Sequence, residues 1–195
     1  MTIAGLVLAP GASAGRDQAG LVAIEAAVLP LGIEVERIDF PYHLAGRRAP
    51  DPVKVLVQVL SDASQSLAAR LHITQGSILV GGRSMGGRVA SLAVAAGLPA
   101  AGLVLVSFPL HPPGRPEKLR TAHFPSLCVA CLFVSGSKDP FASPAELLAA
   151  TADIPGDVTR VVLERADHSL RRSDAEVGDA VRAWILDLGA AEPCA

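Results

Sequence analysis

Residues 78–88 read Ile78-Leu79-Val80-Gly81-Gly82-Arg83-Ser84-Met85-Gly86-Gly87-Arg88. A short aliphatic run leads into a glycine-rich turn, and the Ala-rich segment 86–97 that follows is typical of a helix packed closely on a sheet. The turn fits the pattern G-x-S-x-G, in which a serine stands on a sharp bend between a strand and a helix. Both glycines of the pattern leave room for this bend, because larger side chains would collide with the strand or the helix. The stretch therefore predicts a strand–turn–helix unit with an exposed Ser84.

Similar aliphatic runs recur along the chain and do not alternate with polar residues. Besides 78–81 they are Ile3–Ala9, Ile33–Asp39, Gly102–Ser107, Leu127–Ser135 and Val158–Leu163. Such runs suit strands that are covered on both faces, as in parallel sheets. Helical patterns lie between them, at 17–31, 53–71, 86–97 and 177–188, and capping boxes begin at Ser143 and Ser173. The alternation predicts an α/β fold, doubly wound around a mostly parallel sheet of six or seven strands, with no cap domain.

Composition narrows the class of protein. The chain has 195 residues, of which 50% are hydrophobic, and its net charge is −2. We expect one domain over residues 1–195, with no field that would attract nucleic acid. The apolar stretch Ile3–Ala9 is too short for a signal peptide or a membrane span, which favours a cytoplasmic protein without membrane attachment. These features leave the oligomeric state open.

Three cysteines, Cys128, Cys131 and Cys194, do not form a disulfide framework. No second ligand pair follows them at a spacing that zinc would need, so we predict no metal site. Because free cysteines are usually interior, we interpret Cys128 and Cys131 as buried core thiols.

A serine nucleophile requires a base that takes its proton and an acid that orients the base. Asp139 follows the predicted strand 127–135, and His168 follows the strand 158–163. Both therefore belong to the carboxyl edge of a parallel sheet, where separate loops converge beside Ser84. Asp167 is a competing carboxylate, but a residue adjacent to the histidine usually points its side chain elsewhere. The order Ser84, Asp139, His168 is the order found in α/β-hydrolases.

Backbone N–H groups would have to stabilise the oxyanion of an acyl-transfer reaction. One is expected from Met85, directly after the nucleophile, and another from Ala12 in the loop after the first strand. This loop lacks G-x-G-x-x-G, and G-x-x-x-x-G-K-[ST] is absent as well. We therefore predict that the protein needs no nucleotide or other cofactor.

Several strings together resemble a known group of proteins. They are Gly81-Gly82-Arg83-Ser84-Met85-Gly86-Gly87-Arg88, Phe108-Pro109-Leu110-His111-Pro112-Pro113-Gly114, Pro116-Glu117-Lys118-Leu119-Arg120 and Gly136-Ser137-Lys138-Asp139-Pro140-Phe141. The chain is similar to the compact, lidless α/β-hydrolases of the dienelactone-hydrolase-like branch. Within that branch it looks closest to bacterial relatives of the testis-expressed and NSL-complex hydrolase-like proteins. The resemblance implies a Ser84–Asp139–His168 triad that cleaves a small ester or a related acyl bond.

Four further residues are candidates for substrate binding: Arg83, Phe108, His111 and Phe141. Arg83 either binds an acidic group or pairs with a structural carboxylate, and we favour the structural role. The irregular stretch 108–126 carries several basic residues and one acid. It is either a recognition loop for an anionic substrate or partner, or an ordinary solvated loop.

The sequence thus predicts a serine hydrolase that acts on a small ester, lactone or related acyl compound through a covalent acyl-serine. The alternative is a binding or scaffold protein that keeps the hydrolase fold with an idle triad, because a fold alone does not define a function.

Overall fold

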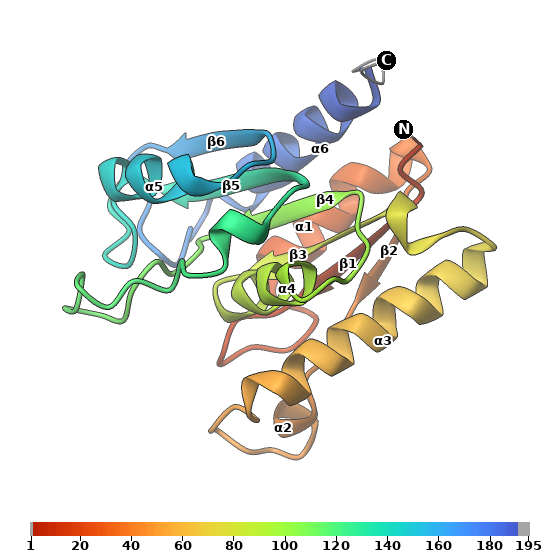
Figure 1. Ribbon diagram of the computed structural model, residues 1–195, viewed down its shortest axis with the longest axis horizontal. Coiled ribbons are helices and arrows are strands. Elements are labelled where there is room, and N and C mark those ends of the chain that lie inside the picture. Colours follow the sequence, from red (N-terminus) through yellow and green to blue (C-terminus); the bar gives the residue numbers. More distant parts are fainter. Residues whose placement is uncertain (1, 191–195) are drawn as a thin grey trace.

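The computed structural model describes residues 2–190, and its centre is a twisted parallel sheet. In the described chain the sheet has six strands in the order β2-β1-β3-β4-β5-β6, and each neighbouring pair is parallel (Figure 1). The strands are β1 Gly5–Ala9, β2 Glu34–Arg37, β3 Ile78–Arg83, β4 Gly102–Val106, β5 Ala130–Gly136 and β6 Val158–Leu163. The predicted doubly wound α/β fold is confirmed, with the lower of the two expected strand numbers.

Helices cover both faces of the sheet. They are α1 Ala19–Val28, α2 Pro41–Leu44, α3 Val53–Leu71, α4 Met85–Ala95, α5 Pro144–Ala150 and α6 Asp174–Ala190. Helices α3, α4 and α5 contribute to one hydrophobic cluster, and α1 and α6 contribute to the other. Figure 1 shows α3 and α4 on the near side of the sheet, with α1 behind it.

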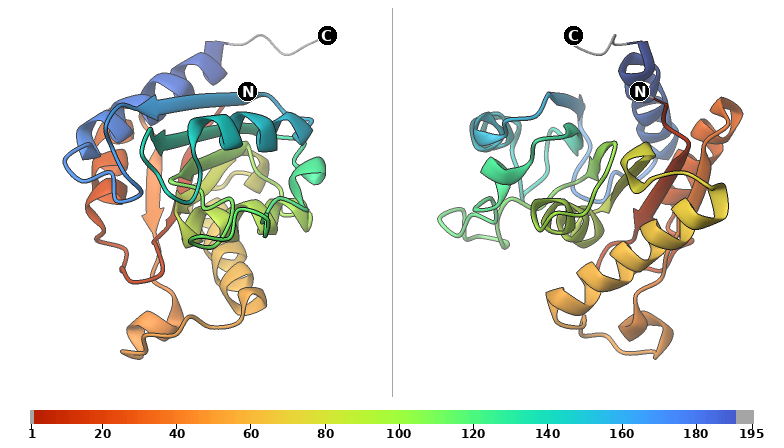
Figure 2. Two further views of the ribbon diagram at one scale, coloured as in Figure 1. Left: turned by 90° about the vertical axis from the view of Figure 1, so that its left-hand side faces the viewer. Right: turned by 45° about the vertical axis from the view of Figure 1, so that its right-hand side comes forward.

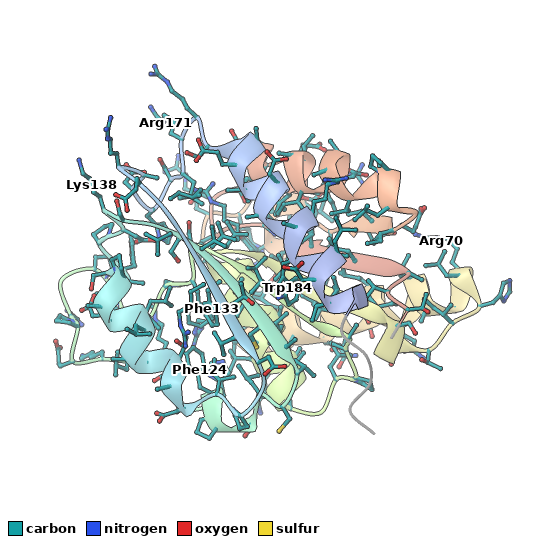
Figure 3. All side chains as sticks on the ribbon, turned by 90° about the horizontal axis from the view of Figure 1, so that it is seen from above. Arg70, Phe124, Phe133, Lys138, Arg171 and Trp184 are labelled. Atoms are coloured by element: carbon teal, nitrogen blue, oxygen red, sulfur yellow. The ribbon has the colours of Figure 1, made fainter. Side chains whose placement is uncertain are left out.

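Side chains of the central strands β1, β3, β4 and β5 alternate between these two clusters, which explains why their sequences are largely apolar. The expectation that every strand is covered on both faces is wrong for the two edge strands, because β2 and β6 are partly exposed and carry polar residues such as Glu34 and Arg160. On β5, Phe133 packs in the cluster with α4, while its neighbour Leu132 packs in the cluster with α6. Figure 3 shows Phe133 and Phe124 across the strands from Trp184 of α6. Burying both faces excludes water from the sheet and supplies most of the hydrophobic stabilisation.

Two helices differ from the prediction. The helix expected over 17–31 ends as an α-helix at Val28 and continues as a 3-10 turn over Leu29–Leu31, which Gly32 ends with a φ of 77°. Helix α2 was not predicted, because a four-residue helix is too short to show a 3.6-residue period. The capping box at Ser143 is confirmed: its hydroxyl accepts the Glu146 N–H, and the Glu146 carboxylate accepts the Ser143 N–H at 2.9 Å.

The prediction for the cysteines is correct at one position and wrong at another. Cys131 is buried in β5, and burial raises the pKa of its thiol to about 12. Cys128 is exposed, because β5 begins only at Ala130 and the residues before it lie outside the sheet. Cys194 lies outside the described residues.

The carboxyl edge of the sheet carries the longest irregular segment of the described chain. Residues 107–123, between β4 and β5, contain no helix or strand and project from this edge (green in Figure 1). The first described residues and the end of α6 lie together at another part of the molecule (Figure 2), where Thr2 and Leu186 line a shared groove. No inserted cap covers the edge within residues 2–190, as predicted.

None of the helices in residues 2–190 is both long enough and apolar enough to cross a membrane.

Candidate active site

Ser84 stands on the predicted bend between β3 and α4. Its backbone has φ 51° and ψ −111°, a conformation that non-glycine residues rarely adopt. Both glycines of the G-x-S-x-G pattern are required, because a Cβ atom on Gly82 or on Gly86 would collide with the carbonyl oxygen of Ala9. The Ser84 N–H donates to the carbonyl oxygen of Val106 at 2.8 Å, which ties the bend to β4. The bend therefore holds the hydroxyl at the N-terminus of α4.

His168 and Asp139 complete a hydrogen-bonded chain with Ser84. The Ser84 Oγ atom lies 2.9 Å from His168 Nε2, and His168 Nδ1 lies 2.8 Å from Asp139 Oδ2. The loops that carry the two residues touch just beyond β5: a Cβ on Gly136 would collide with the carbonyl oxygen of Ala166. With an ionised Asp139, the proton of the neutral imidazole belongs on Nδ1, which leaves Nε2 free to accept the serine proton.

Asp139, rather than Asp167, is the carboxylate that contacts His168. The Asp139 side chain is fully buried, and its Oδ1 atom also accepts the N–H of Phe141 at 2.9 Å. Asp167 is exposed and accepts the N–H and the hydroxyl of Ser169, and these hydrogen bonds hold the pKa of Asp167 below its ordinary value. Asp167 thus shapes the turn that presents the histidine.

Arg83 has a structural role, but a different one from the carboxylate pairing that we favoured. Its Nη2 atom donates to the carbonyl oxygens of His168, at 3.0 Å, and Ser169, at 2.6 Å. Burial lowers the pKa of Arg83, and the charges of Asp174, Asp139 and Asp167 oppose that effect. The residue before the nucleophile therefore holds the backbone of the histidine loop.

The two residues predicted to supply the oxyanion donors, Met85 and Ala12, both line the cleft that contains Ser84. Met85 is the first residue of α4, so helix geometry provides no intrahelical acceptor for its N–H. Ala12 lines the same cleft, in a loop that turns where the Ala14 N–H donates to the carbonyl oxygen of Gly11.

Two side chains hold the Ala12 loop. The Gln18 amide oxygen accepts the Gly11 N–H at 3.0 Å, and the buried Tyr42 hydroxyl donates to the Ala12 carbonyl oxygen at 2.5 Å. Burial raises the pKa of Tyr42, so its hydroxyl keeps the proton that it donates. The unpredicted helix α2 supplies Tyr42, and nothing in the sequence assigned a role to Gln18.

An open cleft of about 630 Å³ surrounds Ser84. Its lining is contributed by the β1–α1 loop, the bend, the start of α4 and the loops after β4, β5 and β6: Gly11, Ala12, Ser13, Ala14, Gln18, Arg83, Ser84, Met85, Arg88, Pro109, Arg120, Phe141 and His168. The ring of Phe141 lies 4.2 Å from the ring of His168, centroid to centroid, and forms an apolar wall beside the base.

Two candidate substrate-binding residues lie away from this cleft. Phe108 is fully buried and packs against Phe124 and Phe133, because the chain leaving β4 turns inward before it reaches the surface. His111 is also buried; its Nδ1 contacts the Pro112 carbonyl oxygen, and its Nε2 lies 3.7 Å from Glu146. Both residues anchor the irregular segment.

That segment is consequently more than a solvated loop. His123 is half-buried, and its Nε2 lies 2.8 Å from the Ser91 hydroxyl. Burial, with a smaller contribution from the charge of Arg88, lowers the pKa of His123 to about 4. Arg120 faces the cleft, whereas Arg115 and Lys118 are exposed outside its lining.

Within residues 2–190, no group of three or more His, Cys, Asp or Glu side chains is arranged to hold a metal ion.

A doubly wound parallel sheet with a serine bend after its third strand and a histidine loop after its last strand defines the α/β-hydrolase class. Residues 2–185 match the family described as "Alpha/beta hydrolase domain". The chain belongs to this family, which confirms the resemblance at the level of the class. The closer likeness to the testis-expressed and NSL-complex relatives stays a prediction.

Solved structures share this fold at low sequence identity. Est1E from Butyrivibrio proteoclasticus, solved with ferulic acid bound, has a TM-score of 0.78 and 18% identity, covering 97% of this chain and 91% of that one. A dienelactone hydrolase from Anabaena variabilis has a TM-score of 0.77 and 18% identity, covering 95% and 87%. A thermophilic esterase from Thermogutta terrifontis has a TM-score of 0.71 and 19% identity, covering 96% and 91%. No curated protein matches this chain in sequence.

Proposed function

We propose that this protein is a serine hydrolase that cleaves a small ester, lactone or related acyl bond through a covalent acyl-serine. This proposal rests mainly on the hydrogen-bonded chain in which His168 Nε2 lies 2.9 Å from Ser84 Oγ and His168 Nδ1 lies 2.8 Å from Asp139 Oδ2. Family membership and the esterase and dienelactone hydrolase neighbours support a hydrolase.

In the acylation half-reaction, His168 Nε2 takes the Ser84 proton while Oγ attacks the carbonyl carbon of the substrate. Asp139 stabilises the imidazolium that forms. The oxyanion of the tetrahedral intermediate accepts hydrogen bonds from the N–H groups of Met85 and Ala12, and the N-terminus of α4 adds favourable electrostatics. When the intermediate collapses, His168 gives its proton to the leaving group, and the acyl group stays on Ser84.

Deacylation repeats these steps with water as the nucleophile. His168 takes a proton from water, hydroxide attacks the acyl-Ser84 carbonyl, and the proton returns to Ser84 Oγ as the acid leaves. The open cleft and the absence of a cap within residues 2–190 favour short or compact acyl compounds over long chains.

Active-site labelling tests the nucleophile. We expect a fluorophosphonate probe to label the wild type and the control Ser13→Ala, since Ser13 lines the same cleft, but not Ser84→Ala. A screen of esters, thioesters and lactones then defines the acyl class. Equal labelling of wild type and Ser84→Ala would contradict the proposal, and an unlabelled wild type would favour an idle triad.

A further inference from the structure

The cleft beside Ser84 is lined by positively charged side chains but by no carboxylate of the described residues. Three of its lining residues are arginines, and none of its described lining residues is Asp or Glu. Arg83 is already engaged by two backbone carbonyl oxygens. Arg88 and Arg120 lack such partners: within residues 2–190, neither guanidinium donates a hydrogen bond to another residue or lies within salt-bridge distance of a carboxylate.

Arg88 lies one helical turn after the nucleophile. Its N–H donates to the Ser84 carbonyl oxygen at 3.1 Å, and both residues line the cleft. The Nε atom of Arg88 is buried and has no hydrogen-bond partner among the described residues. A buried donor without an acceptor is costly, so this position is built to receive one.

The backbone of Arg88 is held by a relay that does not use its charge. The Ser91 hydroxyl donates to the Arg88 carbonyl oxygen at 2.9 Å and contacts His123 Nε2 at 2.8 Å. Because the hydroxyl proton points to the carbonyl, the His123 ring must donate its Nε2 proton to Ser91. The low pKa of His123 keeps that ring neutral at pH 7, so it adds no charge beside Arg88.

Arg120 brings a second positive charge to the same wall. Its N–H donates to the Leu110 carbonyl oxygen at 2.7 Å, which holds this end of the irregular segment at the cleft. Burial, and then the charge of Arg120, lower the pKa of Arg88. Two like charges in a partly desolvated cleft repel each other, and a bound anion would replace this repulsion with attraction.

We propose that Arg88 and Arg120 form an anion subsite that selects acyl substrates bearing a carboxylate or a phosphate close to the scissile carbonyl. The subsite deepens the proposed serine-hydrolase function and rests on it. Guanidinium groups suit this task because their planar donors match the oxygens of a carboxylate or a phosphate in pairs. Because Arg88 and Arg120 line the same cleft as Ser84, the anionic group and the reacting carbonyl belong to one compact substrate.

The kinetic test compares two esters that differ only in charge. The mono-p-nitrophenyl ester of glutaric acid carries a carboxylate, and the p-nitrophenyl ester of glutaric acid monoamide is its neutral match. We expect kcat/KM for the charged ester to exceed that for the amide in the wild type. Arg88→Gln and Arg120→Gln should each lower this ratio by about 10- to 100-fold, the range for a lost charge-assisted hydrogen bond.

Two controls separate the subsite from general damage. Arg115→Gln removes an exposed cation of the same segment that does not line the cleft, and the ratio should stay at its wild-type value. Arg88→Lys keeps the charge but loses the planar donors, so it should recover part of the ratio. Equal ratios in wild type, Arg88→Gln and Arg120→Gln would overturn the proposal.

A binding measurement separates this proposal from the proposed function. Calorimetry on Ser84→Ala, which needs no turnover, should detect glutarate or inorganic phosphate, and Arg88→Gln in that background should weaken the binding at least about tenfold. Binding of glutarate alone assigns a carboxylate, and binding of phosphate alone assigns a phosphate. Arginine-dependent binding without labelling of wild-type Ser84 keeps the subsite and overturns the hydrolase. Labelling of Ser84 without anion binding or a preference for the charged ester keeps the hydrolase and overturns the subsite.

Discussion

The Arg83 guanidinium donates to the carbonyl oxygen of His168 at 3.0 Å, so the side chain next to the nucleophile holds the backbone of the base. Arg83 is the last residue of β3, and His168 lies in the loop after β6, so this hydrogen bond joins the end of one strand to the loop that follows another. It makes the position of His168 depend on the bend that positions Ser84.

This contact predicts that Arg83 affects turnover more than binding. Arg83→Met should lower kcat for a neutral ester by about tenfold or more, because small displacements of a base are costly, while KM changes less. Arg83→Lys should lie between, since its ammonium reaches one carbonyl oxygen. Steady-state kinetics on a p-nitrophenyl ester checks this. A selective rise in KM would instead mean that Arg83 binds substrate.

Substitution of Asp139 should lower kcat far more than substitution of Asp167. Asp139→Asn removes the negative charge and replaces one carboxylate oxygen by an NH2 donor. Because Oδ1 accepts the Phe141 N–H, the NH2 group would face His168 Nδ1 and favour the wrong tautomer, so kcat should fall by about 10³- to 10⁴-fold. Asp167→Asn alters only the turn around Ser169, and we expect a loss within about tenfold. Initial rates of the two purified variants at pH 7.5 give the comparison. Similar losses in both would show that the orienting carboxylate is wrongly assigned.

The tight bend predicts opposite effects for two glycine substitutions. Gly86→Ala forces a Cβ against the Ala9 carbonyl oxygen and should lower the free energy of unfolding by about 3 kcal/mol or more. Gly189→Ala meets no atom within 4 Å on helix α6 and should raise it by up to about 1 kcal/mol. Urea denaturation measures both. A stable Gly86→Ala would contradict the close approach of α4 to β1.

His123 should make the protein less stable in mild acid. Burial lowers its pKa from 6.5 to about 4, so below pH 6.5 the unfolded chain binds a proton that the folded protein does not. Stability is therefore lost as pH falls from 6.5 towards 4, by about 1–2 kcal/mol after allowance for partial exposure.

The substitution His123→Gln tests this linkage, because it keeps an N–H donor for Ser91 but does not titrate. Urea denaturation at pH 7 and pH 4.5 should show a smaller loss for His123→Gln than for the wild type. His72→Gln, at an exposed position, should lose as much as the wild type. Identical losses in wild type and His123→Gln would exclude His123 as the cause.

The four central strands of the sheet were predictable because each has a local apolar signature, whereas the edge strands β2 and β6 are partly exposed and mix apolar with polar residues. A strand that is buried on both faces is apolar at nearly every position. The apolar runs around Val7, Val104 and Phe133 therefore predict strands from local sequence alone. The bend was also predictable from local sequence, because only glycine at positions 82 and 86 avoids a collision between a Cβ atom and the Ala9 carbonyl oxygen.

What the sequence could not show depends on contacts between distant segments. Phe108 follows a strand at the active edge, yet its ring turns into the core because Phe124 and Phe133 offer an aromatic pocket there. Gln18 and Tyr42 support the Ala12 loop only after three segments have met. The sequence places Arg88 four residues after Ser84, but only the folded structure shows that Arg88 has no carboxylate partner.

If the proposed mechanism holds, Ser84 becomes acylated during turnover. Wild-type enzyme mixed with p-nitrophenyl acetate and quenched in acid should carry one acetyl group, which peptide mass spectrometry should locate on Ser84. A stoichiometric burst of p-nitrophenol should precede the steady state if deacylation is slower than acylation. Hydrolysis that continues in Ser84→Ala at the wild-type rate, with no acetyl group on Ser84 in the wild type, would contradict the assignment of Ser84 as the nucleophile.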